Sequence, residues 1–190
     1  MANKIKYGIK NCYYAVATIG SNGAATYSTP VALPGAVSLS LDAQGDTSPF
    51  YADNIVYYTS VANNGYEGDL ELALIPESFY KDCLGYALDQ NNVLYEDAGA
   101  EPVHFALMFQ FEGDESARRH VMYNCVATRP TISGSTKEES IEPQTETISI
   151  VATTIYNAAY DKDVVKASCT TTQSTQYNGW NSAVYQVSST

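Results

Sequence analysis

Three carboxylates at alternating positions, Glu67, Asp69 and Glu71, are the residues of this chain best placed to do chemistry. A strand sends alternate side chains to the same face, so the three should share one face of a sheet. Paired carboxylates of this kind can serve as acid and base in glycoside hydrolysis. Three like charges on one strand are more often a solvated face, and the sequence favours this simpler interpretation.

The other reactive groups do not form a recognisable site. His104 and His120 both fall in strand-like segments, where a surface or cross-strand role is expected. The spacing of Asp42, Asp46 and Asp53 does not match a calcium-binding EF-hand loop. Four scattered cysteines without a C-x-x-C pair suggest buried free thiols in a reducing compartment: Cys12, Cys83, Cys125 and Cys169. With no nucleophile, phosphate-loop or zinc-protease motif, we expect no catalytic residue, metal or cofactor, and no enzyme.

The composition leaves much of the surface without charge, to be either hydrated through Ser, Thr, Asn and Gln or covered by a partner. Charged residues make up only 16% of the chain, against a usual value of about 25%. The 16 tyrosines suit interfaces, although tyrosine also favours strands. The formal net charge of −11 argues against specific binding to nucleic acid phosphates and is otherwise explained by solubility.

Alternation of apolar and polar residues predicts a mostly β, antiparallel sandwich formed by a single domain of residues 1–190. The clearest core strand is 103–111, and further strands are predicted near 37–41, 66–74, 121–127 and 147–151. One flanking α-helix is predicted over 76–88, because Pro76 suits a first helical position and apolar residues recur at helical spacing. A weaker helix is predicted over 173–185, docked through Trp180 and Val184.

Two segments do not fit a packed sheet. Residues 44–64 are rich in tyrosine and predict a projecting β-hairpin that turns at Asp53 and Asn54, with aromatic residues on both faces. Such a hairpin either marks an interface or folds back on its own sheet. Residues 131–144 are polar, contain Gly134 and Pro143, and predict a flexible loop that could also contact other copies.

Four stretches resemble, in the same order, the major tail protein of long, flexible-tailed bacteriophages. They are 6–15 (KYGIKNCYYA), 30–76 with VSLSLDAQGDTSPFYADNIVYYTSV at its centre, 120–130 (HVMYNCVATRP) and 136–153 (TKEESIEPQTETISIVAT). The resemblance implies a β-sandwich with a flanking helix, whose inner strands join those of its neighbours into a continuous β-barrel around a lumen. It also implies hexameric rings that stack into a hollow tube, through which DNA passes into the bacterial host.

The resemblance gives the acidic and aromatic residues possible roles in such a tube. A negative lumen would repel DNA and offer it no deep binding well. We expect some of the following carboxylates to face the lumen: Glu67, Asp69, Glu71, Glu112 and Asp114. The hairpin is the candidate for contacts between rings, through these aromatic residues: Phe50, Tyr51, Tyr57 and Tyr58.

The partners implied are other copies of the chain, tape-measure, tail terminator and tail-tip proteins, and DNA in transient passage. The resemblance implies that the chain is part of the virion. We expect it to be made in the host cytoplasm, because we see neither an apolar signal segment near its N-terminus nor a membrane span. The main alternative is a carbohydrate-binding or adhesin-like sandwich that uses surface tyrosines and Trp180 as stacking platforms. A glycoside hydrolase and a tail terminator or head-decoration protein are the remaining alternatives.

Overall fold

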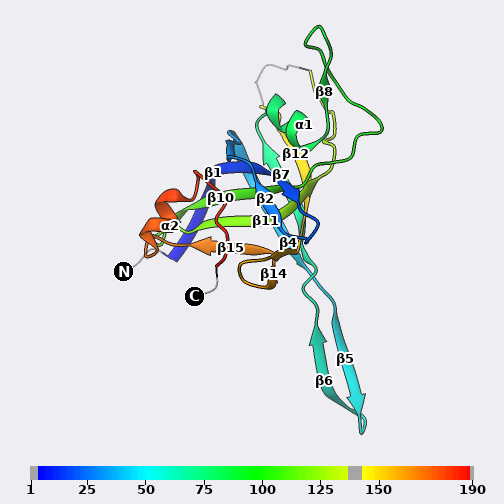
Figure 1. The fold of residues 1–190 in the computed structure, drawn as a ribbon, viewed down its shortest axis with the longest axis vertical. Coiled ribbons are helices and arrows are strands. Elements are labelled where there is room, and N and C mark those ends of the chain that lie inside the picture. The colour runs from blue at the N-terminus through cyan, green and yellow to red at the C-terminus, as the bar shows by residue number, and fades with distance from the viewer. Residues whose placement is uncertain (1–3, 137–142, 189–190) are drawn as a thin grey trace.

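The computed structural model describes residues 4–136 and 143–188 and is mostly antiparallel β, as predicted (Figure 1). The strands are β1 (Lys4–Ile19), β2 (Ala25–Tyr27), β3 (Val31–Ala32), β4 (Ala36–Gln44), β5 (Thr47–Ala52), β6 (Ile55–Val61), β7 (Gly65–Leu72), β8 (Ala87–Leu88), β9 (Leu94–Tyr95), β10 (Phe105–Asp114), β11 (Arg119–Ala127), β12 (Glu146–Thr153), β13 (Ile155–Asn157), β14 (Lys162–Val164) and β15 (Lys166–Cys169). The helices are α1 (Glu77–Cys83) and α2 (Ser174–Gly179).

One sheet organises the fold. Its strands follow the order β2-β1-β10-β11-β12-β7-β4, with β3 added beside β1 and β15 beside β11. Every pairing in it is antiparallel. Both β1 and β4 send side chains into the same hydrophobic core, although they lie far apart in this order. The sheet therefore curves around that core, but within the described residues it does not close into a barrel.

The two faces of the curved sheet are covered unequally. Phe105, Leu107 and Phe109 of β10 point into the inner core, whereas Ala106 and Met108 belong to a second core on the outer face. This is why β10 is an almost continuous apolar run. The second core is covered by α2 and the C-terminal segment, which cover β1, β10 and β11 but not β12, β7 or β4.

Helix α1 closes the inner core. Its Phe79 packs edge-on against Tyr14 of β1 and Phe105 of β10, at ring separations of 5.2 and 5.4 Å. The buried Tyr14 hydroxyl donates to Asp82 at 2.8 Å, which leaves the phenol satisfied. These contacts confirm the predicted flanking helix and explain why its apolar residues repeat at helical spacing.

Both predicted helices are shorter than the sequence suggested. The helix expected over 76–88 ends at Cys83, because Gly85 adopts a left-handed φ of 76° that a helix cannot continue through. The chain then enters strand β8 at Ala87. A side chain at Gly85 would lie 2.8 Å from Cβ of Ala100, so the turn also depends on close packing. The helix expected over 173–185 is reduced to α2, after which the chain continues without regular structure.

The two irregular segments differ from each other. Strands β5 and β6 form the predicted hairpin, which extends away from the body of the molecule rather than folding back on the sheet (Figure 1). The alternative in which the hairpin packs against its own sheet is therefore wrong. Of the loop predicted over 131–144, residues 131–136 and 143–144 have no regular secondary structure, and 137–142 lie outside the described residues.

The centre of β7 depends on a glycine. Gly68 lies between β4 and β12, and a Cβ at this position would lie 1.9 Å from the backbone oxygen of Ser40. We expect Gly68→Ala to lower the free energy of unfolding by about 2 to 3 kcal/mol, because strand β4 would have to move away. Urea unfolding of the purified chain measures this loss. The control is Gly134→Ala, where a Cβ meets nothing within 4 Å. Equal unfolding midpoints for the two variants would contradict the prediction.

Candidate functional site

The strand β7 places the three predicted carboxylates on the outer face of the sheet. Leu70 and Leu72 point into the inner core, so Glu67, Asp69 and Glu71 point outward. Glu67 and Asp69 are exposed and Glu71 is half-buried. The prediction that these three share one sheet face is therefore confirmed.

Neighbouring strands surround this row with hydroxyl groups. Ser38 and Ser40 of β4 stand opposite Glu71 and Asp69. On the other side, Thr147 and Ser149 of β12 stand opposite the same two carboxylates. The exposed face of β4, β7 and β12 is hereafter called the acidic face; its outward positions are Ser38, Ser40, Asp42, Glu67, Asp69, Glu71, Thr147, Ser149 and Val151.

Hydrogen bonds fix two of the carboxylates in place. Thr145 donates its hydroxyl to Oε1 of Glu71 at 2.5 Å, and Ser38 donates to Oε2 at 2.7 Å. Ser149 donates to Oδ1 of Asp69 at 2.7 Å. The bond from Thr145, followed by that from Ser38, lowers the pKa of Glu71 below its ordinary value. Two carboxylates of the acidic face are therefore held in place by hydroxyl donors from the neighbouring chain segments.

Sequence reasoning considered Asp42 only as a calcium ligand and missed its place on this face. The register sets Asp42 directly opposite Glu67. The signal was present in the alternation of Ser38, Ser40 and Asp42 along the strand, but it could not be used without knowing that β4 pairs with β7. Asp42 therefore adds a fourth carboxylate to this face.

The other two lumen candidates lie elsewhere. Glu112 stands near the end of β10, where Lys10 of β1 forms a salt bridge to it at 2.5 Å. Asp114 is the last residue of β10 and pairs through its backbone with Lys4. Strands β11 and β12 separate β10 from β7. The structure thus brings Glu67, Asp69 and Glu71 together and does not bring Glu112 or Asp114 to them.

The hairpin is exposed along its whole length. Phe50 pairs with Tyr58, and beyond a bulge Tyr51 pairs with Val56, so aromatic residues occupy both faces as predicted. The four candidate contact residues are between 61% and 73% exposed: Phe50, Tyr51, Tyr57 and Tyr58. Asp53 and Asn54 form the turn with φ angles of 50° and 63°, which matches the tight turn that hairpins prefer.

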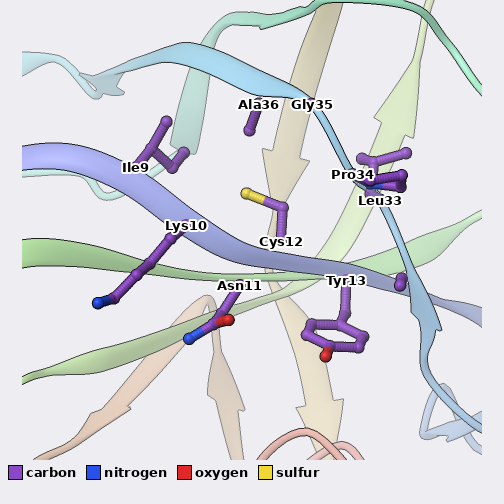
Figure 2. A pocket seen from close by; sticks show the side chains of 10 residues that line it. Ile9, Lys10, Asn11, Cys12, Tyr13, Leu33, Pro34, Gly35 and Ala36 are labelled. Atoms are coloured by element: carbon purple, nitrogen blue, oxygen red, sulfur yellow. The ribbon is translucent and has the colours of Figure 1, made fainter.

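The clefts of the molecule offer little chemistry. Figure 2 shows one of about 370 Å³ between β1 and residues 32–36, where the sulfur of Cys12 points toward the Ala36 side. Lys10 and Asn11 extend to the other side of the strand (Figure 2). Burial raises the pKa of the Cys12 thiol to about 12, so this group is not a nucleophile at neutral pH. Among the described residues, no three His, Cys, Asp or Glu side chains are placed to hold a metal ion.

All four cysteines are free and buried. Burial raises the pKa of Cys125 to about 12 and raises those of Cys83 and Cys169 as well. The expectation of buried free thiols is confirmed.

The histidines and the tryptophan have structural contacts. The His104 ring nitrogen Nδ1 lies 2.7 Å from Oδ1 of Asn124, and His120 stacks on Phe109 of the adjacent strand, in agreement with the predicted cross-strand role. Trp180 is only 2% exposed, because its ring packs in the second core against Tyr185. Trp180 therefore cannot serve as an exposed stacking platform, which contradicts that part of the carbohydrate-binding alternative.

The hydroxyl bonds to Glu71 predict a measurable pH response. Its lowered pKa means that these bonds stabilise the folded chain at neutral pH and that this stabilisation is lost as the pH falls through the lowered value. In Thr145→Val the pKa of Glu71 should rise toward its ordinary value, and in Ser38→Ala it should rise less. Carboxyl-detected NMR titration measures both. A pKa that stays unchanged in Thr145→Val would contradict the assignment.

None of the helices in the described part of the chain is long and apolar enough to cross a membrane.

Comparison with known proteins agrees with the resemblance seen in the sequence. A family model described as "Phage tail tube protein" matches residues 2–185. No curated protein sequence matches the chain. Among solved structures, a chain of the cryo-EM structure of the anti-feeding prophage cap (AFP tube terminating cap) is 14% identical and gives a TM-score of 0.46, covering 87% of this chain and 93% of that one. The structural likeness is too weak to argue from, but the family model spans almost the whole length. This chain belongs to the phage tail tube protein family.

Proposed function

We propose that copies of this chain form hexameric rings that stack into a hollow tube for DNA delivery, with the acidic face lining the lumen. The observation that supports this most directly is the acidic face itself, which no described segment covers and which carries carboxylates held by hydrogen bonds. The number six and the proposed partners, namely tape-measure, tail terminator and tail-tip proteins, follow from the family. The role is structural, and no catalytic step is assigned to any residue.

The acidic face suits passage of DNA without capture. Its outward positions include four carboxylates and no lysine or arginine, so phosphates are repelled and no counterions are released on contact. Hydroxyl groups can donate to phosphate, but two of those on this face, Ser38 and Ser149, and that of the adjoining Thr145 already donate to carboxylates. DNA would therefore meet a surface with a uniform weak repulsion instead of a series of binding sites.

The open sheet edge suits ring formation. Among the described strands, β4 is hydrogen-bonded on one side only, to β7, so the backbone groups along its other side have no paired strand. An unpaired edge of nine residues invites pairing with another chain. A neighbouring copy that adds its sheet at this edge would extend the acidic face around a lumen. Such an interface joins different surfaces of the two copies, and a fixed rotation between them closes a ring.

The hairpin suits contact between rings. Strands β4 and β5 run on into one another, as do β6 and β7, so the hairpin extends the sheet beyond the body of the subunit. Its exposed aromatic side chains are the residue types that contribute most at protein interfaces.

Reversing the charge of the acidic face tests the lumen assignment. Replacing Glu67, Asp69 and Glu71 with Lys, in phage complemented with the variant, should slow DNA ejection by roughly ten-fold or more, because each cation can bind phosphate. Time-resolved ejection onto a fluorescent DNA dye measures the rate. The neutral variant Glu67→Gln, Asp69→Asn, Glu71→Gln should have a smaller effect.

A matched control makes the same charge change elsewhere on the exposed surface, by replacing these residues with Lys: Glu101, Glu115 and Asp163. The lumen assignment requires this control to eject at the native rate. If the acidic-face variant makes tails of normal length and ejects DNA as fast as the control, the acidic face does not line the lumen.

Shortening the hairpin tests its role in stacking. Replacing residues 47–61 with an Asn-Gly turn should leave the urea unfolding midpoint nearly unchanged, since the removed residues are almost entirely exposed. The same variant should form no tubes, as judged by negative-stain electron microscopy. A finer comparison uses Phe50→Ala with Tyr58→Ala against Ser48→Ala with Ser60→Ala, which are both directly paired positions of the hairpin. Tubes of full length from the shortened chain would rule out the hairpin as the stacking element.

A further inference from the structure

A second cleft lies where the two ends of the curved sheet approach each other. It has a volume of about 240 Å³ and is lined by residues of β1, β4, β7, β10, β11 and β15. Its apolar lining includes Leu39, Leu41 and Phe111, which are only partly buried, over the buried Phe109 and Met122. Apolar surface that is open to solvent in a strongly acidic chain suggests a site that another surface covers.

Two lysines flank this cleft. Lys6 places its ammonium 4.8 Å from the ring centre of Phe111. Lys166 lies 4.5 Å from the ring centre of Tyr66 and donates to its hydroxyl at 2.5 Å. The described lining residues include no aspartate or glutamate. In a chain with a net charge of −11, an apolar cleft with this positive rim selects an acidic and apolar partner.

The tip of the hairpin has the complementary chemistry. Residues 44–64 contain two charged side chains, Asp46 and Asp53, and no lysine or arginine. Asp53 lies at the turn, and the nearest cross-strand pair made of two aromatic residues is Phe50 with Tyr58. One carboxylate beside exposed aromatic rings is the combination that the cleft would take.

The cleft cannot be filled by the hairpin of its own chain. The hairpin continues from β4 and β7, and residues of both strands line the cleft. Its tip points away from these strands (Figure 1). Leu41 and Tyr66 lie near the base of the ribbon and Asp53 at its far end. The occupant must therefore come from a second copy.

The opposite end of the molecule is a poorer match for the hairpin. Leu88, Val93 and Tyr95 of the β8–β9 region are exposed there, at 38%, 57% and 48%. Four exposed carboxylates accompany them: Asp89, Glu96, Asp97 and Glu101. Arg129 forms an ion pair with Glu96, but the other three carboxylates leave this surface less favourable to an acidic hairpin tip than the two lysines of the cleft.

We propose that the hairpin tip of a second copy docks in the cleft between β1 and β4, with Asp53 beside Lys6 and Lys166 and an aromatic side chain of the tip on the apolar lining. This inference rests on the proposed assembly of the chain into tubes. The contact joins two different surfaces of the chain, so every copy offers one tip and one cleft, and the contact can repeat through the whole assembly.

Charge reversal within one chain tests the pairing. Asp53→Lys alone, and Lys6→Glu with Lys166→Glu, should each reduce the number of full-length tails in complemented phage by about ten-fold, because each turns an attraction into a repulsion. The chain with all three changes should return to within about three-fold of the native number. The matched control is Lys81→Glu with Lys162→Glu, a partly exposed and an exposed lysine outside the cleft that also contact neighbouring side chains and should leave tail number unchanged. Urea unfolding of each purified variant checks its folding.

A crosslink provides the second measurement. With Asp53→Cys and Lys166→Cys in one chain, mild oxidation of assembled tubes should give a ladder of disulfide-linked multimers, while either single variant should not. If the triple charge variant makes no more full-length tails than its parents and no ladder forms, the docking site is wrong.

The proposed function would still hold in that case if the native chain forms tubes and the chain with the shortened hairpin does not. Native tails without this chain in their tubes would instead overturn the proposed function, and the docking site with it.

Discussion

The strict alternation of side chains along a strand is the constraint on which the rest of this structure depends. It sends Leu70 and Leu72 into the core and leaves Asp69 and Glu71 on the opposite face. Because α2 and the C-terminal segment cover only part of that opposite face, the sheet has an apolar region and a bare acidic region side by side. A single sheet can thereby hold a subunit together and present a uniform polar surface.

The same ribbon of two strands serves both regions of interest. Strands β4 and β7 carry the acidic face, and their continuations β5 and β6 form the exposed hairpin. The strand register shifts by one residue between the β4–β7 pair and the β5–β6 pair, and again near the tip of the hairpin. Such bulges increase the local twist of a two-stranded ribbon. The orientation of the tip is therefore fixed by the register of the sheet beneath it.

Much of the fold could be predicted from the sequence, because alternation and turn signals are local. The row of Glu67, Asp69 and Glu71 and the turn at Asp53 and Asn54 were predicted for this reason. Strand partners are not local, so the pairing of Asp42 with Glu67 and the separate position of Glu112 could not be foreseen. The early end of the first helix was missed because it depends on the packing of Gly85 against the distant Ala100. The cleft between β1 and β4 requires the curvature of the whole sheet, which no segment encodes alone.

The four buried cysteines have a consequence for how such a particle ages. A virion component works outside the cell, where oxygen and peroxides convert exposed thiolates to disulfides and sulfenic acids. Here every thiol lies inside a core and its pKa is raised, so almost none is in the reactive thiolate form at neutral pH. The four thiols of this subunit are therefore protected from disulfide formation in oxidising surroundings without a reductant.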